Sequence, residues 1–302
     1  MTPNYDYHIP VLLQECLEGL QLVPGGIYVD VTFGGGGHSK EILAHMPQDA
    51  RLIAFDKDKD AEENARSIQD PRFTFIKSDF RYIKNHLKFL KINEVDGVLA
   101  DLGVSSHQFD VAERGFSLRF DGPLDMRMDK SASKTAASVL NEYDEEELVR
   151  IFKEYGELFN AKAIVRRIKS MPQMLSIADL KEAVKGLYKP KEEHKFLARL
   201  FQALRIEVND EMPALKELLT QCTEILKPGG RLVVMSYHSL EDRPVKNLIK
   251  TGNFEGNLEK DFYGNPKLLY KSITRKPIVP DEKEIQNNNR ARSAKLRIAE
   301  KL

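Results

Sequence analysis

The sequence predicts an α/β fold: a doubly wound, mostly parallel sheet with an inserted helical domain. Between residues 27 and 101, short hydrophobic runs rich in β-branched residues alternate with helical segments, which is the pattern of βαβ units. A run of glycines directly follows the first of these runs. Residues 102–230 then separate the fourth predicted strand from the fifth, although a parallel crossover needs only about a dozen residues. An insertion is the simplest explanation of that spacing.

The first predicted strand and the turn after it organise the chain. Residues 27–33, IYVDVTF, form a hydrophobic run that starts after a Pro-Gly-Gly turn, and Gly34–Gly37 follow before a helical pattern begins at His38. Glycines let the backbone approach a ligand closely, and the free N–H groups at a helix start attract negative charge. This stretch predicts a binding loop for a nucleotide-like cofactor. A flexible loop is the plainer alternative, but the position between strand and helix argues against it.

The details of the loop favour S-adenosylmethionine (SAM) over a dinucleotide. The dinucleotide fingerprint G-x-G-x-x-G is incomplete, because Ser39 stands where the third glycine is expected. The pattern acid-x-small-x-Gly-x-Gly, typical of SAM-dependent methyltransferases, fits as Asp30, Thr32, Gly34 and Gly36, with Thr32 where glycine is usual. An NAD-dependent oxidoreductase is the rival interpretation, since it shares the sheet and the glycine turn.

Composition indicates an ordinary soluble protein of one large or two medium domains. Of the 302 residues, 41% are hydrophobic and 30% are charged, and 46 basic side chains balance 46 acidic ones. No long apolar run and no signal peptide is recognised, so a cytoplasmic location is expected. Cys16 and Cys222 are too few for a disulfide framework, and the histidines are scattered, so no metal site is expected.

Acidic and aromatic residues follow several predicted strands, at the edge where ligands bind in doubly wound sheets. These strands are expected at residues 51–56, 73–76 and 95–100, with a fifth at 231–236 and a closing pair at 268–274 and 295–299. Asp56 is placed to hold a ribose diol, whereas its competitor Asp58 is favoured as the cap of a helix that reaches residue 68. Phe80 is placed to pack on an adenine ring while Asp79 accepts from the exocyclic amine, with a plain core role for Phe80 as an equal alternative. Asp101 takes the position at which catalytic groups are most common.

The inserted segment is expected to be helical and unevenly charged. Helices are predicted at residues 145–159, with an apolar stripe that includes Phe159, at 161–169, from 176, at 195–207 and at 213–226. Residues 141–159 hold seven acids and two bases, whereas residues 160–205 hold eleven bases and four acids. Residues 263–302 hold ten bases and four acids. About half of these side chains are expected on solvated helix faces, but two basic segments around a cofactor site favour a substrate with a phosphate backbone.

Several long blocks of sequence carry the most specific signal. They are GGGGHS at residues 34–39, DLGVSSHQ at 101–108, RGFS at 114–117, GPLDMRMD at 122–129, FQALRIEVNDE at 201–211, GGRLVVMSYHSLEDRPVK at 229–246 and RARSAKLR at 290–297. Together, and in this order, they closely resemble the bacterial RsmH (MraW) family. The resemblance implies a class I SAM-dependent methyltransferase sheet interrupted by a helical substrate-recognition domain. It also implies methyl transfer to the N4 amine of a cytidine in 16S rRNA, in the decoding region of the small ribosomal subunit.

The same resemblance implies which residues form the site. By position, the family's SAM contacts match Gly36, Gly37, His38, Asp56, Phe80, Asp101 and Gln108. The loop amides would take the methionine end and Asp56 the ribose, while Asp101 and Gln108 would lie nearest the transferred methyl. Asp101 is the candidate catalytic group, as acceptor of the amine protons, and a carbonyl or hydroxyl within residues 102–106 is the alternative. No metal is required.

The expected domains are residues 1–109 with 211–302 for the methyltransferase core, and residues 110–210 for the insertion. SAM is the expected cofactor and 16S rRNA or the small ribosomal subunit the expected partner, with no membrane association. The oligomeric state, a homodimer included, stays open. A non-catalytic RNA-binding or assembly factor that keeps the same fold is a second rival interpretation, against which the polar residues at the strand ends argue.

Overall fold

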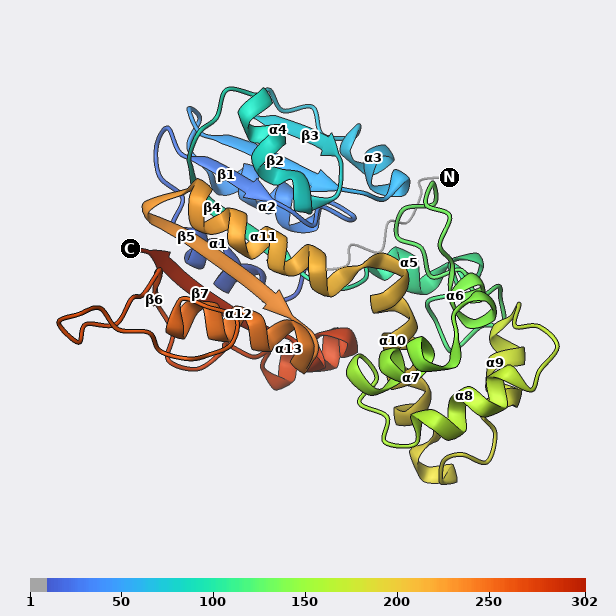
Figure 1. Cartoon of the computed structure of the whole chain (residues 1–302). Coiled ribbons are helices and arrows are strands. Elements are labelled where there is room, and N and C mark those ends of the chain that lie inside the picture. The colour runs from blue at the N-terminus through green and yellow to red at the C-terminus, as the bar shows by residue number, and fades with distance from the viewer. Residues whose placement is uncertain (1–9) are drawn as a thin grey trace. The chain divides into compact units, whose positions relative to one another are not determined.

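The computed structural model describes residues 10–302, which form two compact units (Figure 1). The core unit comprises residues 10–103 and 213–302, and the insertion unit comprises residues 104–212. The sequence placed the start of the insertion at residue 110, but helix α5 (Ser106–Asp110) already belongs to the insertion unit. Among the described helices, none combines the length and the apolar character that a membrane span requires.

A seven-stranded sheet lies at the centre of the core unit, in the order β3-β2-β1-β4-β5-β7-β6. The strands are β1 (Ile27–Asp30), β2 (Arg51–Asp56), β3 (Phe73–Lys77), β4 (Val95–Asp101), β5 (Leu226–Ser236), β6 (Tyr270–Ser272) and β7 (Lys295–Lys301). Neighbours from β3 to β5 pair in parallel, whereas β7 is antiparallel to both β5 and β6. The strand order reverses between β1 and β4. The predicted doubly wound, mostly parallel sheet and its closing strand pair are confirmed.

Both faces of this sheet are buried, which explains the continuous hydrophobic runs of its strands. On β4, Val98 and Ala100 belong to one hydrophobic cluster and Leu99 between them to another, because successive side chains of a strand point to opposite faces. The first cluster also includes residues of α4 (Ile83–Phe89), α11 (Glu211–Ile225) and α12 (Ser239–Thr251). The second includes residues of α1 (Leu13–Leu20) and α2 (Gly37–His45) (Figure 1). The remaining helical segments of this unit are α3 (Lys59–Ala65), η1 (Phe80–Tyr82), α13 (Glu282–Asn287) and η4 (Asn289–Ser293).

Strand β5 starts earlier than the predicted residue 231. Leu226 already pairs with Val95, and the ladder resumes with Arg231 opposite Gly97 after a bulge. Gly229 in this bulge has a φ of 83°, a left-handed conformation that suits glycine. The Pro-Gly-Gly segment at residues 228–230 therefore lies within the strand as a bulge.

The insertion unit is helical, as predicted, and has its own hydrophobic core. Besides α5, its helical segments are η2 (Ala112–Arg114), α6 (Ala136–Glu142), α7 (Glu145–Glu154), α8 (Ala161–Lys169), α9 (Ile177–Val184), η3 (Pro190–Glu192) and α10 (Glu193–Asn209). Asp144 and Ser176 form capping boxes at the starts of α7 and α9. Buried Asn209 donates to the carbonyl of Met126 and accepts from the N–H of Met128, at 2.7 Å each, so the segment before α6 is firmly held.

Two predicted helices end early. Asp58 caps α3 as expected, its Oδ1 accepting from the N–H of Asp60 at 3.0 Å, but α3 stops at Ala65 rather than at residue 68. Helix α7 stops at Glu154 rather than at residue 159, and Glu157 just beyond it has a left-handed φ of 50°. Phe159 is 99% exposed, so its predicted place on an apolar helix stripe is wrong.

Arg72 joins the end of α2 to the start of β3, and so fixes the helix that follows the glycine loop. Its guanidinium pairs with the carboxylate of Asp70 and donates to the carbonyls of Leu43 and Met46 at 2.8 and 3.0 Å. Those carbonyls lie at the end of α2, where they have no partner within the helix. The Arg72 side chain is 15% exposed, so water replaces these bonds poorly.

Replacing Arg72 by alanine is expected to lower the free energy of unfolding of the core unit by ~2 kcal/mol and its thermal midpoint by about 4–8 °C. The matched control is Arg66→Ala, because Arg66 is 73% exposed and pairs only with Glu62 one helical turn away. That control should cost ~0.3–0.5 kcal/mol. Scanning calorimetry of both variants checks this, and equal shifts in the two midpoints would contradict it.

Candidate active site

Three carboxylates lie at the carboxyl edge of the sheet in the core unit. Asp30 ends β1, Asp56 ends β2 and Asp101 ends β4. The register pairs Asp30 with Leu99, so the ends of β1 and β4 lie side by side. Because the strand order reverses between these two strands, this is the place where doubly wound sheets bind their ligands.

The glycine loop has room for a side chain at one position but not at others. Gly36 precedes α2 with a φ of 78°, and a Cβ there would lie 2.7 Å from the ring of Phe33. A Cβ on Gly37 would lie 2.6 Å from Pro10. A Cβ on Gly35 would meet nothing within 4 Å. The close packing at Gly36 and Gly37 therefore requires glycine, whereas Gly35 does not.

Asp56 holds the glycine loop against β2. Its two carboxylate oxygens accept from the N–H groups of Gly34 and Asp58, each at 2.8 Å. Burial raises the pKa of Asp56 to about 6, and these hydrogen bonds act in the opposite direction. A carboxylate oxygen has two lone pairs, so each oxygen can accept one further hydrogen bond. The arrangement suits a vicinal diol.

Asp79 and Phe80, which follow β3, already make contacts with their neighbours. Asp79 caps η1 by accepting from the N–H of Arg81 at 3.0 Å, and it pairs with Lys57 at 3.2 Å. An adenine amine would have to share this carboxylate with Lys57. Phe80 is half-buried and packs against the core cluster beside β2 and β4, so part of its ring is available to a ligand.

Asp30 connects β1, the loop and α2. The side chain is 1% exposed and accepts from the hydroxyl of Ser39 at 2.6 Å and from the N–H of Thr32 at 3.1 Å. Thr32 in turn accepts from the N–H of Asp101 at 2.7 Å. Burial raises the pKa of Asp30, although Ser39 lowers it. Asp30 is enclosed, so its role is to position the loop and the end of β4.

Of the three carboxylates only Asp30 is buried, and Asp101 keeps a quarter of its side chain exposed. The hydroxyl of Tyr237 donates to its Oδ1 at 2.8 Å, and Nδ1 of His38 lies 3.8 Å from its Oδ2. Burial raises the pKa of Asp101 to about 6, against the opposing effects of His38 and Tyr237. Asp101 is therefore ionised at neutral pH and poised to accept a hydrogen or a proton.

His38 is oriented by the backbone. Its side chain is 8% exposed, and Nε2 lies 3.1 Å from the carbonyl oxygen of Val11. A carbonyl only accepts, so Nε2 carries the hydrogen, and Nδ1 faces Asp101. His38 thus lies beside the carboxylate of Asp101. It belongs to the first turn of α2 and follows the glycines that the sequence predicts to bind the cofactor.

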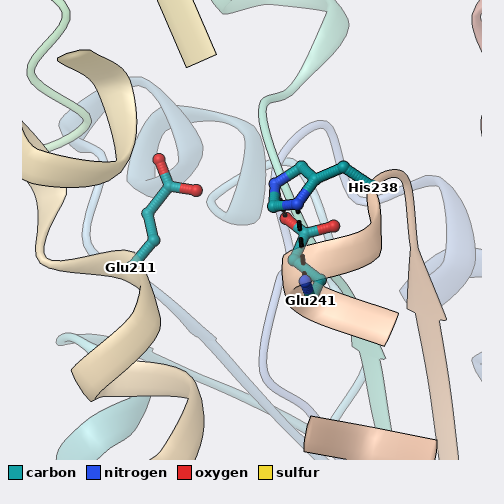
Figure 2. Close-up of side chains that lie close together, drawn as sticks. All are labelled: Glu211, His238 and Glu241. Atoms are coloured by element: carbon teal, nitrogen blue, oxygen red, sulfur yellow. Dashed lines mark hydrogen bonds and ion pairs between the residues drawn. The ribbon is translucent and has the colours of Figure 1, made fainter. Parts of the chain in front are cut away.

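Tyr237, which the sequence analysis assigned no role, is fixed by its neighbours in the same block. Its N–H donates to Glu241 Oε2 at 2.8 Å, and Glu241 Oε1 lies 3.0 Å from Nε2 of His238, as Figure 2 shows for the His238–Glu241 pair. Glu211, also labelled there, begins α11 and belongs to the insertion unit. Burial and the neighbouring Asp101 raise the pKa of Tyr237, which therefore remains a donor. The sequence signal that could have predicted a role for Tyr237 is its position directly after β5, the strand that pairs with β4.

Of the seven residues expected at the site, six belong to the core unit and Gln108 does not. Gln108 lies in α5 of the insertion unit and is 5% exposed. Its Oε1 accepts from the N–H of Ser105, while the Ser105 hydroxyl accepts from the N–H of Gln108, which forms a capping box. Gln108 thus caps the start of α5, and its contact with SAM stays a prediction.

Comparisons with known proteins find relatives that match this chain over nearly its whole length. The ribosomal RNA small subunit methyltransferase H of Phocaeicola vulgatus is 56% identical over 298 residues, which cover 98% of this chain and 97% of that protein. The protein of the same name from Flavobacterium johnsoniae is 56% identical over 305 residues, with both chains fully covered. An rRNA methylase structure from Streptococcus thermophilus covers 95% of this chain and 93% of its own at 11% identity, but its TM-score of 0.41 is too low to carry an argument.

A family comparison covers almost the whole chain. Residues 6–302 match the family described as the MraW methylase family. That span includes the glycine loop, the carboxylates of the sheet edge, the complete insertion unit and β7. The chain belongs to the MraW methylase family.

Proposed function

We propose that this protein transfers a methyl group from SAM to the N4 exocyclic amine of a cytidine in 16S rRNA of the small ribosomal subunit, in the cytoplasm. The observation that carries the proposal is the family membership over residues 6–302, together with relatives above 50% identity that are named small subunit rRNA methyltransferases. The choice of the N4 amine rests on the resemblance of the sequence blocks to that family.

The core unit offers suitable partners for each part of SAM. The loop of Gly36 and Gly37 is packed too closely for side chains, and the N–H of Gly36 already donates to the carbonyl of Phe33. The N–H groups of the first turn of α2 are therefore the ones that suit the methionine end. The spare lone pairs of Asp56 suit the ribose hydroxyls, and the half-exposed face of Phe80 suits the adenine. SAM supplies an electrophilic methyl group on a positively charged sulfur. A carboxylate edge next to that charge is favourable.

Asp101 is the residue that we assign to the acceptor amine. In direct transfer, the nitrogen forms a bond to the methyl carbon as the carbon–sulfur bond breaks, and the nitrogen then loses a proton. An acceptor for the amine hydrogens localises the nitrogen lone pair, and Asp101 can take the proton because its pKa of about 6 keeps it ionised at neutral pH. Tyr237 holds the carboxylate in place through its hydroxyl, so positioning contributes to the rate.

The insertion unit supports RNA as the substrate. Among the bases of residues 160–205, Lys185 and Arg205 have carboxylate partners, whereas the exposed Arg166 and Arg167 on α8 have none within the part of the chain that the structure describes. When an unpaired cation neutralises a phosphate, the counterions of the RNA backbone are released, and this release favours binding. The zero net charge of the whole chain therefore does not exclude exposed, unpaired bases on one helix of the insertion unit.

The two rival interpretations have less support. An NAD-dependent oxidoreductase would need close helix–strand packing at the third glycine, but Ser39 occupies that position and donates to buried Asp30. A non-catalytic assembly factor would not need an accessible carboxylate, yet Asp101 keeps a quarter of its side chain exposed and is oriented by the Tyr237 hydroxyl.

A Gly36→Ala variant is expected to bind SAM about 10-fold more weakly, since a left-handed alanine costs ~1–2 kcal/mol before its contact with Phe33 is counted. The matched control is Gly35→Ala, whose Cβ would enter open space and whose φ is not in the left-handed region. That variant should keep the affinity of the wild type within about twofold. Calorimetric titration with SAM measures both, and equal losses would contradict the role of Gly36.

The rate of methyl transfer, measured in single turnovers at saturating SAM and unmethylated small subunits, is expected to rise with pH through about 6 and then level off, because Asp101 must be ionised. Asp101→Asn should lower the plateau by about 10²-fold and abolish this limb.

The free energy of unfolding changes with pH in the opposite direction. Because the pKa of Asp101 is raised in the folded state, the stabilisation by protonated Asp101 is present below pH 3.8 and is lost as pH rises through about 6.

The affinity for SAM must be measured at each pH, because Asp56 also has a pKa of about 6. If Asp101→Asn kept the acidic limb and the plateau of the wild type, another group would be the acceptor.

A further inference from the structure

Phe159 is an aromatic side chain of the insertion unit that is exposed to solvent. It is 99% exposed, although its neighbours in the chain are tied down. Leu158 is 5% exposed and its N–H donates to the carbonyl of Phe152 at 3.0 Å. Asn160 donates from its side chain to the carbonyl of Leu187, also at 3.0 Å. The exposure of Phe159 therefore does not come from a loose loop.

The corner before Phe159 is a strained one. Glu157 has a φ of 50°, a left-handed conformation that costs a residue other than glycine ~1–2 kcal/mol. A Cβ on Gly156 would lie 2.8 Å from the carbonyl oxygen of Phe152 and 3.2 Å from that of Arg199, so only glycine fits there. Backbone strain of this kind concentrates at functional sites, because the surrounding structure must stabilise it. The corner fixes the backbone from which the side chain of Phe159 projects.

Phe159 lines a shallow hollow of about 550 Å³ together with Lys153, Glu157, Leu158 and Arg199. Within residues 10–302, neither Lys153 nor Arg199 has a carboxylate partner at ion-pair distance. Two exposed bases of the next helix, Lys162 and Arg166, follow in sequence. The hollow thus combines a fully exposed ring with two cations and one carboxylate, Glu157, which leaves a net positive charge for an anion.

We propose that this hollow binds an unpaired nucleotide of single-stranded RNA, with the base stacked on Phe159 and its phosphate held by Lys153 and Arg199. Only an unpaired, splayed-out base offers its face to an aromatic ring, and basic grooves with exposed aromatics bind single strands in this way. The inference deepens the proposed function, on which it rests, by naming a subsite for RNA outside the core unit.

The charge of the hollow favours RNA over a second copy of this chain. In a symmetric dimer through this face, the two cations and one carboxylate of each copy would meet the same set on the other copy. A net positive charge would then face a net positive charge, which is unfavourable at an interface. A polyanion neutralises that charge. The exposed apolar surface is limited to one ring and is too small to hold two copies together by itself.

The test measures the affinity of the full-length protein for a fluorescein-labelled 12-nucleotide RNA without secondary structure, by anisotropy at fixed salt. Phe159→Ala is expected to weaken binding about 10-fold, the loss of one stacked base, while Phe159→Trp stays within about twofold of the wild type. Lys153→Ala should reduce the slope of log affinity against log salt by about one contact. The same RNA annealed to its complement should show no dependence on Phe159.

The matched control is Phe262→Ala, because Phe262 is 97% exposed but lies beside Asp261 and Glu259 in the core unit. Equal losses in the two alanine variants, no loss in Phe159→Ala, or a change in sedimentation of Phe159→Ala without a change in RNA affinity would each overturn the inference. Methyl transfer to small subunits is scored separately: a wild type that binds the RNA through Phe159 but methylates no subunit would refute the proposed function and leave this subsite standing.

Discussion

The buried carboxylate of Asp30 is the group on which the geometry of the sheet edge depends. An isolated charge at 1% exposure would be costly, so its hydrogen bonds from Ser39 and Thr32 must be made. Making them ties the first turn of α2 to the end of β1. The glycine loop between these two elements then has little freedom to move.

Thr32 extends this arrangement to Asp101, the residue that we assign to the acceptor amine. The sequence pattern usually has glycine at this position, but the Thr32 hydroxyl accepts from the N–H of Asp101 and so couples β1 to the end of β4. Tyr237, which follows β5, donates to the side-chain carboxylate of the same residue. Three neighbouring strands thus converge on Asp101, which explains how a partly exposed carboxylate can be held in one orientation.

Local patterns predicted what local physics decides. The strands of the sheet followed from hydrophobic runs, and the choice between Asp56 and Asp58 followed from cap chemistry, because Asp58 is indeed the helix cap. The ends of α3 and α7 were placed too late, since helical periodicity continued in sequence beyond the point where the backbone leaves the helix. Phe159 shows the limit clearly: its spacing fitted an apolar stripe, whereas the left-handed Glu157 turns the chain first.

Contacts between segments that are far apart in the chain could not be predicted from the sequence. The pairing of Tyr237 with Asp101 and the double hydrogen bond from Arg297 to Asp242 depend on which strands become neighbours. The block resemblance marked both segments as important without saying what they contact. The place of Gln108 was likewise undetermined, because its unit is set by the packing of α5 and not by its distance from β4 in sequence.

The central claim is that the carboxyl edge of β1, β2 and β4 holds the adenosyl group with its sulfur directed toward Asp101. A crystal structure of the full chain with S-adenosylhomocysteine tests it most directly. The account predicts ribose hydroxyls at hydrogen-bond distance from Asp56 and the sulfur on the Asp101 side of the glycine loop. An adenosyl group bound elsewhere, with Asp56 still contacting only the N–H groups of Gly34 and Asp58, would contradict it.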